Sequence, residues 1–452
     1  MACEGLEHAM SIEADRVHLG GTARNLHIFE RIKFAPGEAR AVAWAWLYVF
    51  AVFLAYYVLR PIRDELGVSG GVDKLPWLFT GTLIAMLSVN PLFAYAVKKL
   101  PRTKFIPVAY RFFMANLLVF ICALKLAGSE YEIWVGRAFF IWTSVFNLFV
   151  VSIFWSFVVD LFDTGQGKRL FGLLSAGATL GGIVGSALTY LSIESFGRMW
   201  LLLGAVVLLE LAVFASKRLR ASAERIPNRL PDVMQAAPVG GGVFAGMINV
   251  FRSPYLLGIA LFILLYSLTS TILYFQQATI AEANFATREG RTQFFANIDL
   301  WVNVLTLVCQ VFLTSPLLAS AGVVATLSIL PLFSVVGFAG LAASPTVAVF
   351  VAAQVARRVS NFALARPARE VLFTSVSRED RYKAKNFIDT VVYRAGDQIA
   401  GWSFAGFTAI GLGTTGIAVL AVPISLIWLS LSIWLGLRQR ANEKASRRQQ
   451  IA

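Results

Sequence analysis

Long apolar runs recur along most of this chain. They are about 20 residues long, the length of helix that crosses the hydrocarbon core of a bilayer. Of the 452 residues, 57% are hydrophobic and only 15% are charged, too few polar groups for the surface of a soluble protein of this size. The runs are too long for barrel strands and lack strand alternation, so helices are the expected spanning form. The sequence therefore predicts an all-α protein embedded in a lipid bilayer.

We expect about twelve transmembrane helices. The predicted spans are 41–60, 77–97, 106–127, 133–158, 171–193, 198–216, 254–275, 295–318, 321–343, 345–365, 386–411 and 414–437. Loops rich in Lys and Arg are expected on the cytoplasmic side of a membrane. Those loops are 98–104, 167–169, 217–252, 357–385 and the C-terminal tail. Their alternation with cation-poor loops, and the even number of spans, predict that both termini are cytoplasmic.

One long polar interruption divides the chain into two sets of six predicted spans. The expected segments are a cytoplasmic N-terminal segment (1–40), a first six-helix half (41–216), a cytoplasmic linker (217–253), a second six-helix half (254–437) and a cytoplasmic tail (438–452). Six plus six spans with both ends inside resembles the arrangement of major-facilitator transporters, whose halves are related by a repeat. We therefore predict a major-facilitator-like fold.

A short internal match supports such a repeat. Without a gap, "RLFGLLSAGATLGGIVG" (169–185) aligns with "KNFIDTVVYRAGDQIAG" (385–401), so that Phe171 pairs with Phe387 and Gly185 with Gly401. Each stretch follows a basic loop and opens the fifth span of its half. The second copy has charges where the first has Leu, Ala and Gly, so the shared scaffold does not require them.

The charges of the eleventh span are candidates for function, because an ionisable group inside a membrane costs free energy unless it faces a cavity or a partner. The α-helical spacing places Lys385, Asp389, Tyr393 and Asp397 on one face, next to Arg394. We interpret Lys385, Asp389 and Asp397 as coupling or gating residues, and Tyr393 and Arg394 as substrate-binding residues. The alternative is a structural ion pair, for example between Arg394 and Asp397.

The end of the first span, "YYVLRPIRDELG" (56–67), offers fixed positive charge beside a proline that disrupts helical hydrogen bonding. If the helix continues past the proline, these groups line a central cavity near its outer end. Arg60 and Arg63 are then candidates for binding an anion, since guanidinium donates to carboxylate and phosphate in a bidentate way. Asp64 is a candidate gating residue. The alternative is a solvated loop.

Further polar groups lie in or beside other spans. Asp160, Lys168 and Arg169 close the fourth span and open the next loop, where gating salt bridges are common; contact with the substrate is the alternative. Asp299 and Asn303 begin a polar stripe on the eighth span, with Asp299 as a gating candidate and Asn303 as a substrate contact; an exposed helix start is the alternative for Asp299. Tyr266 begins a similar stripe on the seventh span and is a substrate-binding candidate. Buried polar stripes need partners, and a water-filled path supplies them.

Several other functions are disfavoured. All three histidines fall in the first 27 residues and the three cysteines lie far apart, so no metal or cofactor is expected. The net charge of +14 is concentrated in loops, where it sets topology, so no nucleic-acid partner is expected. The Gly-rich "LGGIVGS" (180–186) lacks the lysine of a phosphate loop, and indicates close helix packing instead. No enzyme signature is present, and we predict that the protein is not an enzyme.

Three stretches resemble the nucleotide transporter family, the ATP/ADP translocases of intracellular bacteria and plastids. They are "YYVLRPIRDELG" (56–67), the region 154–186, and "KAKNFIDTVVYRAGDQIAGW" (383–402). The resemblance implies a divergent member of this family within the major facilitator superfamily, in a bacterial inner (cell) membrane. It keeps a cation at Arg63 and an acid at Asp160, the positions where the family has Lys and an acid.

The same comparison shows two departures from the family pattern. The family's Lys after Arg-x-Gly is Asp397 here, and its acid and Trp-Lys after the seventh span are replaced by "ILYFQQ" (272–277). Each missing contact to a polyanion is worth roughly 1–4 kcal/mol. A triphosphate is therefore a less favoured substrate than a smaller anion, a zwitterion or a proton-coupled solute.

We conclude from the sequence that the protein is a secondary active transporter that works by alternating access on a small anionic or zwitterionic solute. A coupling proton or a counter-substrate in antiport is expected. One alternative is a true nucleotide (ATP/ADP) exchanger. Another is a non-transporting membrane receptor or assembly factor on a transporter scaffold.

Overall fold

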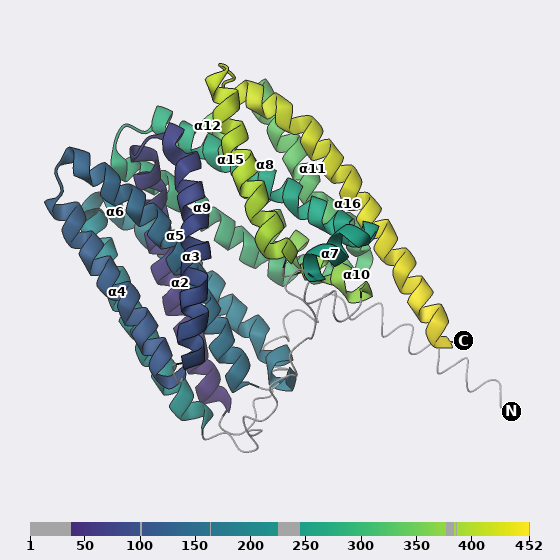
Figure 1. Ribbon diagram of the computed structural model, residues 1–452, viewed down its shortest axis with the longest axis horizontal. Coiled ribbons are helices and arrows are strands. Elements are labelled where there is room, and N and C mark those ends of the chain that lie inside the picture. The colour runs from purple at the N-terminus through teal and green to yellow at the C-terminus, as the bar shows by residue number, and fades with distance from the viewer. Residues whose placement is uncertain are drawn as a thin grey trace.

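The computed structural model describes residues 38–99, 102–162, 164–224, 245–376, 384–385 and 387–451, and these residues form a bundle of long helices (Figure 1). The N-terminal helices are α2 (Glu38–Ser69), α3 (Leu75–Lys99), α4 (Arg102–Leu126), α5 (Ser129–Leu161) and α6 (Thr164–Ala223). The C-terminal helices are α8 (Pro254–Asn284), α9 (Arg288–Phe312), α10 (Thr314–Ser320), α11 (Gly322–Ala343), α12 (Val347–Val359), α13 (Arg366–Leu372), α15 (Tyr393–Ala409) and α16 (Thr414–Ile451). The predicted all-α fold is confirmed. In Figure 1 the purple and blue helices of the N-terminal set lie mostly to the left of the green and yellow helices α11, α15 and α16.

Ten of these helical segments are long and apolar enough to cross a membrane. One of them, within α6, contains two predicted spans, because Gly197 interrupts the helical path with φ 72° and ψ 169°. A glycine accepts this positive φ at no steric cost. The predicted eleventh span is shorter and more polar, with only 17 residues in α15 after a π-helix at Ile388–Val392. Counting both, the described helices accommodate the twelve predicted spans.

The predicted linker and terminal segments are only partly described. Of the linker 217–253, residues 217–223 continue α6 and Ala245–Arg252 form the short helix α7. Residues 225–244 and the first 37 residues lie outside the described residues. The predicted division into segments remains a prediction.

Three clusters of buried apolar side chains organise the bundle. One is formed by residues 41–223 alone and a second by residues 250–435 alone, so each set of helices has a core of its own. The third joins Val68, Leu75 and Phe140 to Phe275 and Phe404, and so crosses between the two sets. We call the end of the bundle that bears the α2–α3, α8–α9, α11–α12 and α15–α16 connections the upper end. The cluster that crosses between the two sets lies toward this end.

The positions matched by the internal repeat occupy equivalent places. A Cβ added to Gly181 would lie 2.5 Å from the backbone oxygen of Phe50, so α6 packs directly on α2. The matching residue, Asp397, contacts Ser267 of α8, the first long helix of the C-terminal set. Gly185 likewise meets Leu54, and Gly401 meets Phe275. The predicted close packing of "LGGIVGS" is confirmed, since no larger side chain would fit at Gly181 or Gly185.

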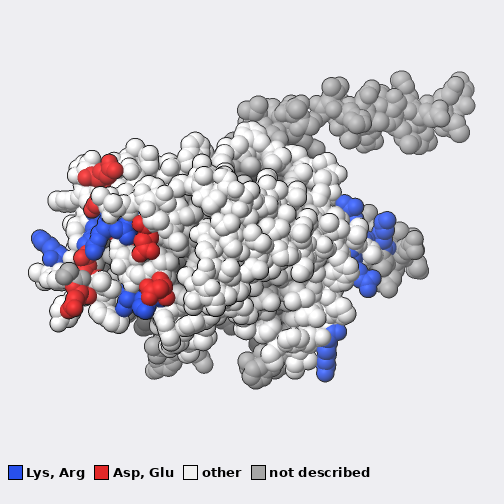
Figure 2. Space-filling view, turned by 90° about the horizontal axis from the view of Figure 1, so that it is seen from above, with Lys and Arg blue, Asp and Glu red and all other residues white. Residues whose placement is uncertain are grey.

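Charged side chains avoid the middle of the surface that faces the viewer in Figure 2. On the face seen in Figure 2, they gather at two ends and leave a broad uncharged band between them. Acidic and basic groups mix at one end of this face, while Lys and Arg gather at the other. An uncharged band of this kind matches the hydrocarbon region of a bilayer.

Candidate functional site

The helix α2 continues through Pro61 and carries four charged residues into the bundle. Asp64 and Glu65 are 4% and 1% exposed, and the Arg60 side chain is 18% exposed. A proline is tolerated inside a helix when neighbouring groups and helices compensate for the lost hydrogen bond. The alternative of a solvated loop at this position is therefore wrong, and the "RPIRDE" segment lies within the packed bundle.

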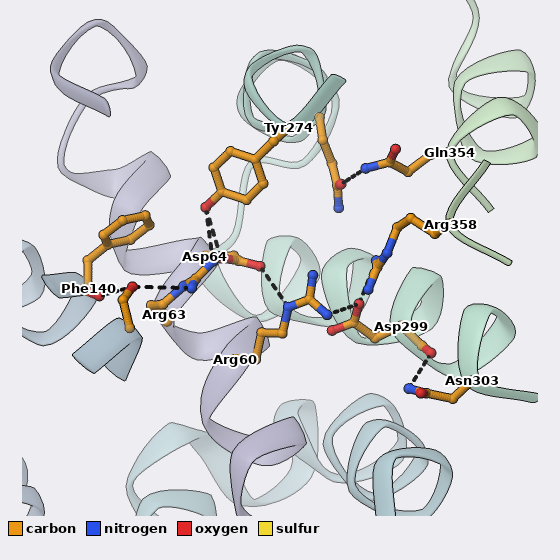
Figure 3. A network of polar contacts seen from close by, with 11 residues as sticks. Arg60, Arg63, Asp64, Phe140, Tyr274, Asp299, Asn303, Gln354 and Arg358 are labelled. Carbon is orange, nitrogen blue, oxygen red and sulfur yellow. Dashed lines mark hydrogen bonds and ion pairs between the residues drawn. The ribbon is translucent and has the colours of Figure 1, made fainter. Parts of the chain in front are cut away.

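Asp299 of α9 joins the two sets of helices through its carboxylate (Figure 3). Its Oδ1 lies 3.1 Å from Nη1 of Arg60 on α2 and 2.7 Å from Nη1 of Arg358 on α12. Asp299 is only 2% exposed. It is therefore not an exposed helix start, and its carboxylate is shared by the partly buried guanidinium of Arg60 and the buried one of Arg358.

The carboxylate of Asp64 also joins the two sets of helices, through a hydrogen bond from Tyr274 of α8 (Figure 3). Its Oδ1 lies 2.5 Å from Nη2 of Arg63, and the hydroxyl of Tyr274 on α8 donates to the same oxygen over 2.9 Å. The guanidinium of Arg63 also lies over the ring of Phe140, 4.7 Å from its centroid. The aromatic face and the carboxylate both favour the cation in a position where water is scarce.

We call Arg60, Arg63, Asp64, Tyr274, Asp299 and Arg358 the central cluster. Three guanidinium groups and two carboxylates leave it with one positive charge in excess when all are ionised. Arg60 is nine residues from the upper end of α2 and Asp299 is eleven from the start of α9, about 14 and 16 Å at 1.5 Å per residue. These depths are near the middle of the hydrocarbon core of a bilayer.

Two arginines of this region were assigned wrongly from the sequence. The stretch 357–385 was counted among the basic cytoplasmic loops, yet Arg357 and Arg358 lie on α12 and are 1% and 9% exposed. Helix α12 continues through a π-helix (Ser360–Ala365) into α13, so this part of the stretch is membrane-embedded. The signal that could have found them was their position inside the predicted span 345–365.

The charges of the eleventh span contact different partners. Asp397 is 5% exposed; its Oδ2 lies 3.2 Å from Nη1 of Arg394, and its Oδ1 accepts from Ser267 and Thr271 of α8. Asp389 instead faces Arg369 on α13 at 3.4 Å. The predicted single face is broken because the π-helix at Ile388–Val392 widens one turn and shifts the helical register. The local Arg394–Asp397 pair is present, as the structural alternative expected.

The other candidates in the C-terminal helices are scattered. Lys385 pairs with Glu370 at 2.5 Å, away from the central cluster. Tyr266 accepts a hydrogen bond from Asn361, and its ring centroid lies 6.0 Å from that of Tyr393. Asn303 donates to the backbone oxygen of Asp299 over 2.8 Å. A Cβ on Gly182 of α6 would lie 3.0 Å from the Asn303 side chain, so Asn303 lies where the two sets of helices touch.

For three candidates the structure gives the helix but not the position of the side chain. Asp160 lies in α5 and Lys168 and Arg169 lie in α6, but their side chains are outside the described residues. Their gating role remains a prediction. Among the described residues, no group of three or more His, Cys, Asp or Glu side chains is arranged to hold a metal ion.

A further ion cluster near the upper end was not predicted. Glu132 of α5 pairs with Arg198 of α6 and with Arg288 of α9. Thr80 of α3 and Gln398 of α15 add a hydrogen bond of 2.8 Å between the two sets. The two sets of helices are therefore joined by polar groups toward the upper end as well as in the central cluster.

Comparison with known proteins gives a consistent result. No family model matches the sequence. The ADP,ATP carrier protein 1 of Chlamydia pneumoniae is 21% identical over 464 residues, covering 87% of this chain and 90% of that protein. The ADP,ATP carrier protein 1 of Chlamydia trachomatis serovar D is 20% identical over 461 residues, covering 87% of each chain.

Solved structures with the same fold are membrane transporters. A bacterial homologue of the iron transporter ferroportin in an inward-facing state has a TM-score of 0.63 at 13% identity, covering 89% of this chain and 98% of that chain. A bacterial homologue of the human lysosomal transporter Spinster, inward-facing and unoccupied, has a TM-score of 0.58 at 14% identity, covering 90% and 99%. The nucleoside transporter NupG has a TM-score of 0.56 at 13% identity, covering 89% and 99%. The chain is thus similar over most of its length to the ADP,ATP carrier proteins, and its fold is the one that these solved membrane transporters share.

Proposed function

We propose that this transporter moves a small anionic solute by alternating access and that the central cluster is its gate. The observation that favours this most is the carboxylate of Asp299, held between Arg60 and Arg358. A contact that joins the two sets of helices at mid-depth must break for the upper end to open. An anion that competes for the two guanidinium groups would supply the free energy for that change.

An anionic solute fits the charge of the site. The central cluster has one positive charge in excess, and Arg357, the residue before Arg358 on α12, adds another buried cation. Two like charges in a medium of low dielectric repel each other by several kcal/mol unless an anion lies between them. A neutral or cationic solute would leave this excess uncompensated.

We further propose that both termini are cytoplasmic, in a bacterial inner membrane. The upper end then faces outward, and the contacts between the two sets of helices toward that end describe a carrier closed to the outside. The mixed charges at one end and the basic ones at the other in Figure 2 agree with cytoplasmic placement of the basic end.

The coupling role is proposed for Asp397 rather than for Asp389. Asp397 is buried and has one cationic partner, while the Asp389 side chain is 30% exposed and is paired with Arg369 on a neighbouring segment. A buried carboxylate that loses its cation must take up a proton or a new partner. Movement of Arg394 toward a bound anion would thus be linked to protonation of Asp397.

Nucleotide exchange is the second candidate function. The sequence relatives are ADP,ATP carriers, and that resemblance covers most of the chain. Asp397 is negative, and Gln276 and Gln277 carry no charge to offer a phosphate group. Both glutamines are already hydrogen-bonded, Gln277 to the side chain of Gln354 and Gln276 to the backbone oxygen of Thr414. The site therefore offers fewer contacts to phosphate groups. A nucleotide with fewer phosphate groups is therefore favoured over ATP.

Uptake into proteoliposomes tests both candidates. The purified protein should accumulate one member of a panel of radiolabelled dicarboxylates, sugar phosphates, AMP, ADP and ATP. Uptake of ADP or ATP that requires internal nucleotide and ignores a pH gradient would favour the exchanger. Absence of uptake of every anion, with uptake of a neutral or cationic solute instead, would contradict the proposed anionic substrate.

A further inference from the structure

Arg357 differs from the other buried arginines of the central region in its surroundings. It is 1% exposed, and its Nη2 donates to the backbone oxygen of Tyr266 over 3.0 Å and to Oγ1 of Thr269 over 3.1 Å. Among the described residues no carboxylate lies within ion-pair distance of it, whereas Arg358 next to it is paired with Asp299. Arg357 is thus a fully buried guanidinium held by neutral groups only.

A buried charge without a counter-charge is costly, and proteins tolerate it mainly where the charge is used. The ring of Tyr266 offsets part of the cost, because its centroid lies 5.2 Å from the guanidinium carbon of Arg357. The Nε–H group of Arg357 is buried and has no hydrogen-bond partner among the described residues. The buried Nε–H donor and the positive charge therefore both remain unsatisfied at the same side chain.

The elements around Arg357 are locally distorted. The π-helix Ser360–Ala365 follows it directly, and the π-helix Ile388–Val392 ends next to Tyr393, whose ring lies 6.0 Å from that of Tyr266. Such wide turns cost backbone stability and are frequent at functional sites. Asn361, in the first of them, donates to the hydroxyl of Tyr266 over 2.9 Å, which leaves that hydroxyl free to donate to a ligand.

We propose that Arg357 is the anchor for an oxyanion, a carboxylate or a phosphate group of the transported solute, with the hydroxyl of Tyr266 as a second donor. This inference rests on the proposed function and deepens it, because it separates binding from gating. Arg60, Asp299 and Arg358 hold the two sets of helices together. Arg357, whose hydrogen bonds among the described residues all go to α8, holds the solute in every state of the carrier.

The ligand is an oxyanion because of the donors on offer. Guanidinium presents N–H groups in a planar fork that matches carboxylate and phosphate oxygens. Nη2 of Arg357 is already engaged, whereas Nε, the two N–H groups of Nη1 and the hydroxyl of Tyr266 donate to no acceptor among the described residues and remain for a ligand. An anionic group accepts from these donors and neutralises the charge.

The experiment measures thermal stability and uptake for the full-length protein in nanodiscs and proteoliposomes. The probes are inorganic phosphate and AMP in one arm and acetate and succinate in the other, each against sodium chloride at equal ionic strength. We expect at least one arm to raise the unfolding midpoint of the wild type by about 2–4 °C. The arm that does so identifies phosphate or carboxylate as the recognised group.

Arg357→Met distinguishes a ligand anchor from a structural cation. Without ligand, it should be at least as stable as the wild type, because it removes an uncompensated charge, and it should lose the shift with every probe. Arg358→Met should have a lower midpoint without ligand, since it leaves Asp299 with one partner fewer. Arg357→Lys keeps the charge without the fork and should retain a smaller shift.

Arg111→Met is the matched control. Arg111 is an exposed arginine on α4 that pairs with Glu210 at 2.6 Å, far along the chain from the proposed site, and its loss should leave the anion shift unchanged. An anion shift of equal size in Arg357→Met and the wild type, or no shift of the wild type with any probe, would overturn the proposed anchor. Unchanged KM for anion uptake in Arg357→Met would overturn it too, while leaving anion transport established. A shift that depends on Arg357 without any uptake would instead support the anchor and contradict the transport proposal.

Discussion

Nη1 of Arg60 on α2 lies 3.1 Å from the carboxylate of Asp299 on α9, and this ion pair joins the N-terminal helices to the C-terminal helices at mid-depth. The same oxygen of Asp299 also accepts from Arg358. The carboxylate of Asp299 is buried, with only 2% of the residue exposed, whereas Arg60 is partly buried. A change at Asp299 is therefore expected to affect both stability and the conformational cycle.

Asp299→Asn should destabilise the closed upper end. The partly buried guanidinium of Arg60 and the buried one of Arg358 would lose their shared carboxylate, and loss of one partner of a buried ion pair costs about 3–5 kcal/mol. The unfolding midpoint in detergent should fall, and uptake should slow by at least about tenfold. Glu282→Gln, a change at an exposed carboxylate on α8, is the control and should leave both unchanged. Wild-type stability and uptake in Asp299→Asn would show that the shared carboxylate is not a gate.

A cross-link between α3 and α15 should stop transport. Thr80 Oγ1 donates to Gln398 Oε1 over 2.8 Å, and Trp77 lies against Trp402 with ring centroids 4.8 Å apart. In a background without the native cysteines, Thr80→Cys with Gln398→Cys should react with a short thiol-specific cross-linker. Uptake should be lost after cross-linking and return when a cleavable linker is cut. The two single-cysteine variants serve as controls, and uptake that survives complete cross-linking would contradict separation of the helices at this point.

Tyr274→Phe should have a small and specific effect. It removes the hydroxyl that donates to Asp64 over 2.9 Å but leaves the ring and the Arg63–Asp64 pair in place. A hydrogen bond to a charged group contributes about 1.5–3 kcal/mol to stability, so the midpoint should fall by a few degrees. Tyr131→Phe, at an exposed ring, should show no fall. A variant as stable as the wild type would mean that Asp64 is satisfied without Tyr274.

Asp397→Asn should uncouple uptake from a pH gradient. The amide can still hydrogen-bond with Ser267 and Thr271, so the packing of α15 on α8 should survive while the titrating group is lost. Asp389→Asn is the comparison, because Asp389 is paired with Arg369 and lies closer to the protein surface. Uptake should be measured with and without an imposed pH gradient. Equal dependence on the gradient in Asp397→Asn and the wild type would exclude Asp397 from coupling.

The membrane-embedded helices were predictable because the signal is local. A run of about 20 apolar residues satisfies its own backbone hydrogen bonds as a helix whatever surrounds it, so spans such as 41–60 and 414–437 could be placed from composition alone. The small residues of "LGGIVGS" likewise indicated close packing, and Gly181 and Gly185 do pack against the backbone of α2.

The candidate site was only partly predictable because ion pairs depend on distance in space. Arg60 and Asp299 were both singled out from the sequence, but 239 positions separate them, and nothing in either segment indicates that they meet. Arg358 was assigned to a cytoplasmic loop, because a pair of arginines after an apolar run usually ends a span. Only the continuation of the helix through the π-turn shows that these arginines are buried.

By itself, the sequence determined a polytopic helical membrane protein with charges unusually deep in its spans, since hydropathy and length act within each segment. The tertiary structure decided which charges neutralise one another: Asp299 is shared by Arg60 and Arg358, Asp397 is paired with Arg394, and Arg357 has no carboxylate within ion-pair distance among the described residues. The physical reason is that the free energy of a buried charge is set by the groups within a few ångströms of it, and those groups come from helices that are distant in the chain.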